Sequence, residues 1–378
     1  MPAVRARHHS PEGAGASYLA SVPLLPLHGH ETVLRRLDDA IRRDALPASL
    51  LLQGPMGIGK QRLALWLGQR LLCTGAEPRP CGTCQHCRYA LAGTHPDIHW
   101  YFPRPRLKDA DPSPEDVEDD FRDAVGERTK NGVYPPPPPE DAILIATIRA
   151  MAHSASLLPA LGARKVYVLG EADRLVVRDD AEYAAGAFLK LLEEPPPRTT
   201  IILTSSEPGA LIPTIRSRVV ALRVPPLAPE AVDAVLAEPA MREAIAAAGV
   251  AARPEEQRRL AAGAPGALLA RGEWSDALAR ARAMLEAAVA GDRREQMRAA
   301  LVQGGARARG AFSTSLDALT TLLHERARTA VERGNGHGAR VAATALDAVE
   351  EAKERATGNV NPQLITSELL RRLEATLR

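Results

Sequence analysis

The stretch that most constrains the fold has the sequence Gly-Pro-Met-Gly-Ile-Gly-Lys-Gln and covers residues 54–61. An apolar run, Leu50–Leu52, precedes it, and leucines follow it at helical spacing, at positions 63, 67 and 71. The pattern predicts a strand, a glycine-rich loop and a helix, which is the layout of a phosphate-binding P-loop. Glycines let the backbone turn its N–H groups toward phosphates, and Lys60 is expected to reach the terminal phosphates.

Two positions depart from a working P-loop ATPase. The residue after the lysine should carry a hydroxyl that ligates Mg²⁺, but it is Gln61. After the apolar run Lys165–Leu169, which predicts a third strand, the position of the second Mg²⁺ ligand is Gly170. Glu171 remains beside it, and Asp173 could substitute as a ligand. The residues alone leave open whether this is a working nucleotide site or one that has lost its chemistry.

The four cysteines of the chain form a second strong signal, because they cluster at Cys73, Cys81, Cys84 and Cys87. Four thiols at this spacing predict one tetrahedral Zn²⁺ site. Disulfides are a poor alternative in a reducing cytoplasm, and cysteines that only fill a core do not cluster in this way. His86 could compete as a ligand, but four cysteines already complete the shell. A closed site of this kind favours a structural staple over a contact with nucleic acid.

Composition narrows the classes of protein that remain. The 378 residues, 45% of them hydrophobic, are enough for two or three domains with cores of their own. Aromatic residues make up only 3%, which favours closely packed helices over an all-β sandwich. The formal charge of +2 excludes a general polycation, so any nucleic-acid contact would be local or shared with a partner. Without a spanning run or a signal core, we expect a cytoplasmic protein with a disordered tail at residues 1–20.

The rest of the chain predicts an α/β half followed by a helical half. Strands are expected at residues 50–52, 97–102, 165–169, 200–204 and 219–224. Residues 103–140 break the periodicity with an acidic patch and a run of prolines, so we interpret them as a surface insertion with at most a short helix near 114–124. Ser205 and Ser206 bring hydroxyls to the carboxyl end of the fourth strand, where α/β sheets bind ligands. From Pro225 on, the pattern predicts helices only, among them one over residues 266–271, with breaks in the C-terminal part at residues 291, 304–305, 334–338 and 362.

Several motifs together resemble one known family. Besides the P-loop and the cysteine knuckle directly after its helix, they are Gly-Thr-His-Pro-Asp at 93–97, Phe-Leu-Lys-Leu-Leu-Glu-Glu-Pro-Pro at 188–196 and Thr-Ile-Arg-Ser-Arg at 214–218. This combination resembles the AAA+ subunits of the bacterial clamp loader, and within that family the delta-prime subunits. The resemblance is detailed from about residue 27 to residue 271 and looser toward the C-terminus.

The resemblance implies the fold class and the domains. The expected fold is an α/β AAA+ P-loop domain with a five-stranded parallel sheet and an inserted zinc knuckle, then a helical lid, then a C-terminal all-α collar that joins subunits into a ring. The expected ranges are 21–224 for the AAA+ domain, 73–87 for the knuckle within it, 225–272 for the lid and 273–378 for the collar.

The resemblance also implies roles for the site residues. ATP-hydrolysing members carry Ser or Thr after the P-loop lysine, Asp-Glu after the third strand and a sensor arginine in the lid, and here those places hold Gln61, Gly170 and Gly266. A degenerate nucleotide site with weak or absent ATP binding is therefore expected, formed by Gly54, Gly57, Gly59, Lys60, Gln61 and Glu171. Arg218 matches the arginine finger that this family offers to a neighbour's ATP, although without that context an arginine before a strand would count as surface charge.

The implied role is that of a non-hydrolysing subunit of the DNA polymerase III holoenzyme, a DNA-directed DNA polymerase (nucleotidyltransferase) complex. The chain would join gamma/tau-type ATPase subunits and a delta subunit in a hetero-oligomeric ring and help to load the sliding clamp onto primed DNA. One alternative is an active clamp-loader ATPase subunit, which the three lost positions oppose. The other is a stand-alone zinc-knuckle nucleic-acid-binding protein, which the low net charge and the few aromatic residues oppose.

Overall fold

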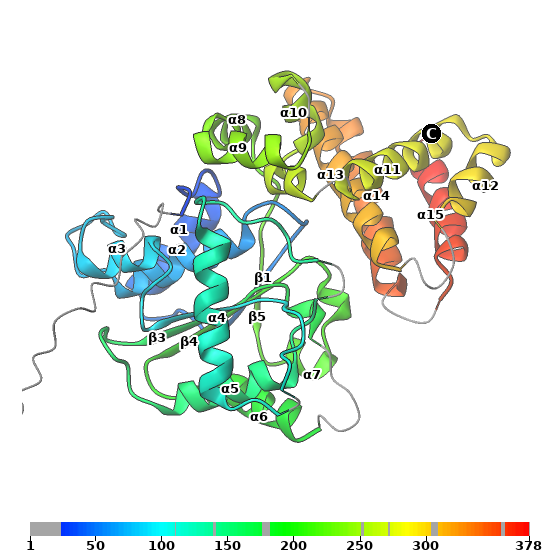
Figure 1. Cartoon of the computed structure of the whole chain (residues 1–378). Helices are drawn as coiled ribbons and strands as arrows, with labels where there is room; N and C mark the ends of the chain where they lie inside the picture. The colour runs from blue at the N-terminus through cyan, green and yellow to red at the C-terminus, as the bar shows by residue number, and fades with distance from the viewer. Residues whose placement is uncertain are drawn as a thin grey trace, which may run out of the picture.

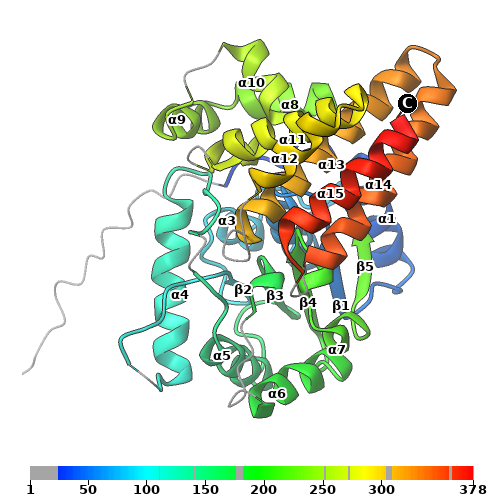
Figure 2. The ribbon, with the colours of Figure 1, turned by 90° about the vertical axis from the view of Figure 1, so that its right-hand side faces the viewer.

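The computed structural model describes residues 24–109, 111–138, 141–175, 182–250, 253–270, 273–303, 309–356 and 360–377, so the tail predicted at residues 1–20 lies outside the described residues. Five strands form one sheet: β1 (Ser49–Gln53), β2 (Ile98–Tyr101), β3 (Lys165–Leu169), β4 (Thr199–Ser205) and β5 (Val220–Arg223). All neighbouring pairs are parallel, in the order β2-β3-β4-β1-β5 (Figure 2). The predicted five-stranded parallel sheet is confirmed.

Helices cover this sheet on both faces. In Figure 1, α1 (Glu31–Arg42) and α2 (Lys60–Leu72) lie above the sheet, and α5 (Ile145–Ser156) and α6 (Glu182–Glu193) lie below it. The three central strands are therefore buried along nearly their whole length, as expected for a parallel sheet. The edge strand β5 differs, because most of its residues are exposed and Val220 is 53% exposed.

The insertion after β2 differs from the expected surface loop. Residues Pro114–Thr129 form α4, which is longer than the predicted helix and begins with a capping box between Ser113 and Asp116. The buried side chains of Val117 and Phe121 face the sheet domain, and α4 packs against β2 (Figure 2). The helix thus covers the edge strand that would otherwise expose unpaired backbone groups. The many acidic residues of this segment concealed its apolar stripe in the sequence, and two of them, Glu118 and Asp120, bond to Tyr101 and Arg104.

A group of short helices follows the sheet domain and forms the predicted lid. It contains α8 (Pro229–Ala237), α9 (Pro239–Ala247), α10 (Pro254–Ala261) and a 3₁₀ helix, η4 (Pro265–Leu269), which replaces the helix predicted over 266–271. These elements share a small core of their own. Figure 1 shows them on the same side of the sheet as α2.

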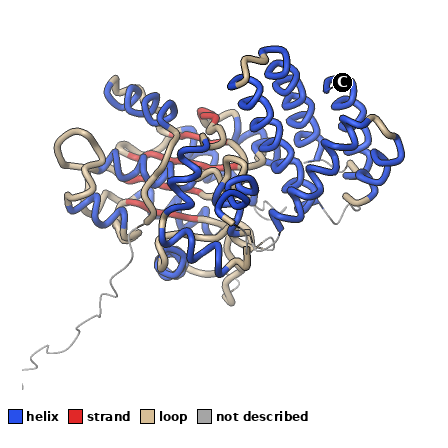
Figure 3. Tube along the Cα trace, turned by 90° about the horizontal axis from the view of Figure 1, so that it is seen from above, coloured by secondary structure: helices blue, strands red, loops and turns tan. Residues whose placement is uncertain are grey.

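The C-terminal part is helical throughout its described residues, with α11 (Glu273–Ala290), α12 (Arg293–Leu301), α13 (Arg309–Glu332), α14 (Gly336–Ala356) and α15 (Pro362–Leu377). The predicted breaks at Gly291 and Pro362 are confirmed, and the one at residues 304–305 lies outside the described residues. The break predicted over residues 334–338 is shorter than expected, because α14 already begins at Gly336. These helices pack side by side to one side of the sheet (Figure 3). Within the described ranges, we find no helix with the combined length and apolarity needed to cross a membrane. The domain boundaries stay predictions.

Candidate nucleotide pocket and metal site

The glycine-rich loop between β1 and α2 has the backbone of a P-loop. Gly57 and Gly59 adopt φ of +80° and +94°, a region that residues with a Cβ rarely occupy, and Gly59 caps the N-terminus of α2. Gly54 is required for a different reason, since a Cβ there would lie 2.2 Å from the carbonyl oxygen of Val224. The predicted order of strand, loop and helix is therefore confirmed.

The ammonium of Lys60 turns back onto this loop. Its Nζ donates hydrogen bonds to the carbonyl oxygens of Gly54 (2.7 Å) and Pro55 (2.8 Å) and to the hydroxyl of Ser206 (2.8 Å). These three bonds use every proton that an ammonium can donate. The residue is only 6% exposed, and burial lowers its pKa to about 8. A phosphate could bind Lys60 only by displacing these acceptors.

The side chain of Gln61 fills the place of a metal ligand. Its Oε1 accepts a hydrogen bond from the Trp100 indole N–H at 2.9 Å, and its Nε2 lies 3.4 Å from Glu171 Oε1. A Cβ built on Gly170 would stand only 2.4 Å from Gln61 Oε1. The two departures from a P-loop ATPase, Gln61 and Gly170, are therefore packed against each other. The amide of Gln61 occupies the space that a side chain at position 170 would need.

The two acidic residues near Gly170 are also engaged within the chain. Glu171 adopts φ of +52°, donates its N–H to Thr204 Oγ1 (3.0 Å) and accepts a hydrogen bond from Arg174 Nη1 (3.0 Å) on Oε2. Asp173 Oδ1 accepts the backbone N–H of Ser206 at 3.2 Å, and burial raises its pKa to about 6. Asp173 therefore contacts Ser206 at the carboxyl end of β4, the same residue whose hydroxyl accepts a hydrogen bond from Lys60.

One cavity of about 160 Å³ is lined by Lys60, Gln61, Glu171 and Ser206. Small-molecule sites usually measure roughly 300–1,000 Å³, so the cavity is small for a nucleotide. Five of the six residues predicted for the nucleotide site line it, and Gly54 contributes only its carbonyl to Lys60. The sequence did not reveal two further lining residues, Arg128 and Tyr134, which come from the insertion. No local motif marks either of them.

The lid touches the loop through its backbone. Gly266, at the position where the family resemblance expects a sensor arginine, donates its N–H to the carbonyl oxygen of Gly57 at 2.9 Å. A Cβ on Gly57 would lie 2.3 Å from the backbone nitrogen of Ala267. Glycine at both positions thus lets η4 approach the loop more closely than any side chain would allow.

Arg218 does not line this cavity. It follows α7 (Pro213–Arg216) and precedes the exposed edge strand β5. Its Nε donates to Glu193 Oε1 at 2.6 Å, and its Nη1 donates to the carbonyl oxygen of Thr214 at 2.8 Å. The Arg218 side chain is 28% exposed and that of Glu193 is 47% exposed, so this ion pair lies at the surface.

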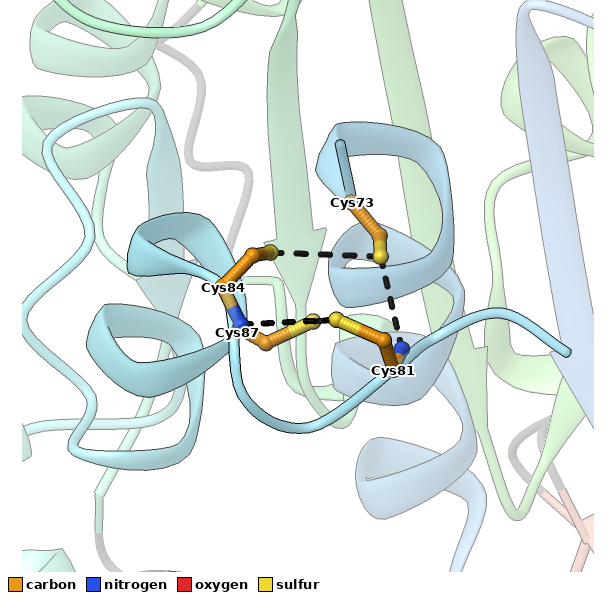
Figure 4. A group of neighbouring side chains, drawn as sticks. All are labelled: Cys73, Cys81, Cys84 and Cys87. Carbon is orange, nitrogen blue, oxygen red and sulfur yellow. Dashed lines mark hydrogen bonds between the residues drawn. The ribbon is translucent and has the colours of Figure 1, made fainter. Parts of the chain in front are cut away.

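The four cysteines converge although they come from three different pieces of backbone. Cys73 directly follows α2, and Cys81 lies in the loop after it. Cys84 is the N-cap of α3 (Gln85–Leu91), and Cys87 lies within that helix. Their Sγ atoms all lie within 4.8 Å of one another (Figure 4). Two of the sulfur–sulfur distances are 3.9 Å, close to the edge of about 3.8 Å expected for a tetrahedron with Zn–S bonds of about 2.3 Å. The group could hold a metal ion such as zinc.

The surrounding backbone supports this cluster. The N–H of Cys81 points to Cys73 Sγ at 3.3 Å, and the N–H of Cys84 points to Cys81 Sγ at 3.4 Å, which lowers the pKa of the Cys81 thiol. A Cβ on Gly75 would lie 2.4 Å from Cys81 Sγ, so only glycine fits there. His86 turns away from this set, because its Nδ1 lies 2.9 Å from His95 Nε2.

Comparison with known proteins places the chain in a family. The family model described as "DNA polymerase III, delta subunit" matches residues 29–228, more than half of the chain. The delta′ subunit of DNA polymerase III from Bacillus subtilis is 28% identical over 206 residues, covering 54% of this chain and 50% of that protein. The delta′ subunit from Pseudomonas aeruginosa is 34% identical over 171 residues, covering 45% and 40%.

A third relative is the tau subunit of DNA polymerase III from Escherichia coli, which is 28% identical over 191 residues, covering 50% of this chain and 23% of tau. The chain thus spans half or less of the length of each of these relatives. The resemblance predicted from the motifs is confirmed, and the chain belongs to the DNA polymerase III delta subunit family.

Proposed function

We propose that the chain is a delta-prime-type subunit of a bacterial clamp loader that does not hydrolyse ATP itself. The observation that carries this proposal is the interlocking of Gln61 with Gly170, where a Cβ would meet the amide oxygen at 2.4 Å. Mg²⁺ needs oxygen ligands in near-octahedral geometry, and both positions that supply them in P-loop ATPases are replaced here. The amide oxygen of Gln61 already accepts the Trp100 indole N–H.

Three further features agree with a site that does no chemistry. Lys60 is bound to its own loop, Glu171 is paired with Arg174, and the backbone of η4 lies directly on Gly57. Each of these contacts would have to break before a nucleotide with its metal could sit as it does in an active site. ATP binding by this subunit is therefore weak or absent in the proposed role.

The catalytic contribution of the chain would come from Arg218, acting on a neighbouring subunit. The residue stands beside the exposed strand β5, which is a suitable surface for a neighbour. A planar guanidinium stabilises charge on γ-phosphoryl oxygens, and arginine fingers contribute on the order of 10³-fold or more to turnover. The surface ion pair with Glu193 is worth at most about 1 kcal/mol, so Arg218 could exchange it for a phosphate at little cost.

The cysteine cluster fits a structural role. Zn²⁺ would be held by Cys73, Cys81, Cys84 and Cys87, leaving no open coordination position for catalysis. The ion would fix the end of α2 to α3 and stabilise the domain that carries the P-loop.

The proposed partners are gamma/tau-type ATPase subunits and a delta subunit in a ring, with the sliding clamp and primed DNA bound by the whole complex. The test is reconstitution of these subunits with and without this chain, followed by assays of DNA-stimulated ATP turnover and clamp loading. We expect loading only when the chain is present. Equal loading in its absence would contradict the proposal.

A further inference from the structure

The insertion carries a segment that touches both the sheet domain and the lid. We call residues 128–138, from the last turn of α4 to the described end of the proline run, the strap. Val133 packs against the hydrophobic core of the lid, and the next residue, Tyr134, packs against the core of the sheet domain. Successive side chains of an extended chain point in opposite directions, so this short piece of backbone can reach two cores at once.

Arg128 attaches the strap to the edge strand. Its guanidinium carbon lies 4.0 Å from the ring centroid of Phe102, 4.8 Å from that of Tyr134 and 5.1 Å from that of Trp100. A cation among three aromatic faces is attracted to each of them. Its buried Nε has no hydrogen-bond acceptor within the described part of the chain. Burial lowers the pKa of Arg128 to about 10, so the side chain remains charged at neutral pH.

Hydrogen bonds hold the strap on either side of Val133. The carbonyl oxygen of Gly132 accepts the N–H of Leu25 at 2.8 Å, and Leu25 itself packs against the lid core. The carbonyl oxygen of Pro137 accepts a hydrogen bond from Arg174 Nη1 at 3.3 Å, and Arg174 also binds Glu171. Prolines between these points restrict the backbone to extended conformations, which keeps the connection stiff.

We propose that the strap fastens the lid to the P-loop domain and so keeps η4 on the loop and the nucleotide cavity narrow. Arg128 and Tyr134 line that cavity together with the lid residues Val235 and Met241, so loosening the strap would free the lid and widen the cavity together. The strap would hold the lid and the P-loop domain together as one rigid body through contacts within the chain itself. This inference concerns the isolated chain and does not depend on Arg218 or on any partner.

Hydrogen–deuterium exchange of the full chain tests the strap. Arg128→Met keeps the length of the side chain and removes its charge, and Val133→Ser removes the apolar contact with the lid. Both should speed amide exchange at least several-fold in peptides that cover 229–247 and the loop 54–59, while α14 exchanges as in the wild type. Lys130→Ala is the matched control, because Lys130 lies in the same segment but is exposed, with a single surface contact to Glu127. It should leave lid exchange unchanged.

The result that would overturn the proposal is wild-type exchange in the lid and the loop for both strap variants. Thermal unfolding of each variant identifies those that fold. If Arg128→Met does not fold, the exchange of Val133→Ser alone tests the proposal. Val133 is only partly buried, so the protein should fold with a serine at that position. Since no ring assembly or clamp loading enters this readout, its outcome is independent of the proposed function.

Discussion

Gln61 Oε1 lies 2.4 Å from the point where a Cβ on Gly170 would stand, so the Gln61 side chain fits here only because position 170 has no side chain. In an ATPase of this layout the two positions hold the hydroxyl and the carboxylate that bind Mg²⁺. Here the amide of Gln61 occupies the space next to Gly170 and accepts a hydrogen bond from the Trp100 indole N–H. The proposed loss of the metal site would therefore be a packed arrangement and not merely two missing ligands.

This coupling can be measured by unfolding the protein in urea. Gly170→Ala should destabilise the fold by about 1–3 kcal/mol, because the new methyl group overlaps the buried amide. Gln61→Ala should remove most of that penalty in the double variant, which gives a coupling free energy of roughly 0.5–3 kcal/mol. Additive effects of the two substitutions would contradict the packing relationship.

The isolated chain should hydrolyse no ATP above background, since no ligand for Mg²⁺ remains at either position. Lys60→Ala should accordingly leave the background rate unchanged. The measurement is a steady-state turnover assay on the purified chain with Mg²⁺ present. Sustained hydrolysis that disappears in Lys60→Ala would show a working site.

The cysteine cluster should bind about one zinc ion per chain, because four thiolates at tetrahedral separation close its coordination shell. The double substitution Cys84→Ser with Cys87→Ser should release the ion and lower the thermal stability. His86→Ala is the control, since His86 faces His95, and it should keep the ion. Elemental analysis of protein purified under reducing conditions measures the zinc content of each variant. Full zinc content in the double cysteine variant would show that Cys84 and Cys87 are not ligands.

A pH-dependent contribution to stability is expected at the junction of β4 with the C-terminal helices. Burial raises the pKa of Glu207 to about 7, with Asp173 and Asp317 adding to the effect and Lys353 opposing it. A raised pKa in the folded state means that stability from this group is present below its ordinary value of 4.5 and is lost as the pH rises through about 7.

Glu207→Gln should therefore stabilise the protein at pH 8 by about 1–3 kcal/mol relative to its effect at pH 4.5. The comparison needs urea unfolding of wild type and variant at both pH values. Glu354→Gln, which changes an exposed carboxylate on α14 beside the same junction, serves as the control. Equal differences between Glu207→Gln and wild type at the two pH values would contradict the expectation.

Local patterns in the sequence were enough to predict the positions of the strands and the cysteine cluster, whereas the parallel five-stranded sheet followed from the family resemblance. The central strands contain apolar runs, and the four cysteines are spaced as metal ligands, so both signals can be recognised without knowledge of distant contacts. The packing of Gln61 on Trp100 could not be predicted, because residues far apart in sequence meet only in the folded sheet. The same holds for the strap, since the alternation of Val133 and Tyr134 between two cores has no signature in a proline-rich segment.

The central claim is that this chain acts on a neighbour's ATP through Arg218. Arg218→Ala should leave folding, zinc content and ring assembly intact, because a surface arginine contributes little to the core. Arg218→Lys should fail in loading as well, since an ammonium cannot reproduce the planar guanidinium. Arg216→Ala, an exposed neighbour on α7, is the matched control and should behave as wild type.

The most direct measurement is the clamp-loading rate of the reconstituted ring that carries each of these variants. We predict a marked loss of loading for Arg218→Ala and Arg218→Lys, with a smaller fall in total ATP turnover because one site in the ring depends on this residue. Loading at the wild-type rate in a fully assembled Arg218→Ala ring would contradict the account and leave the chain a purely architectural subunit.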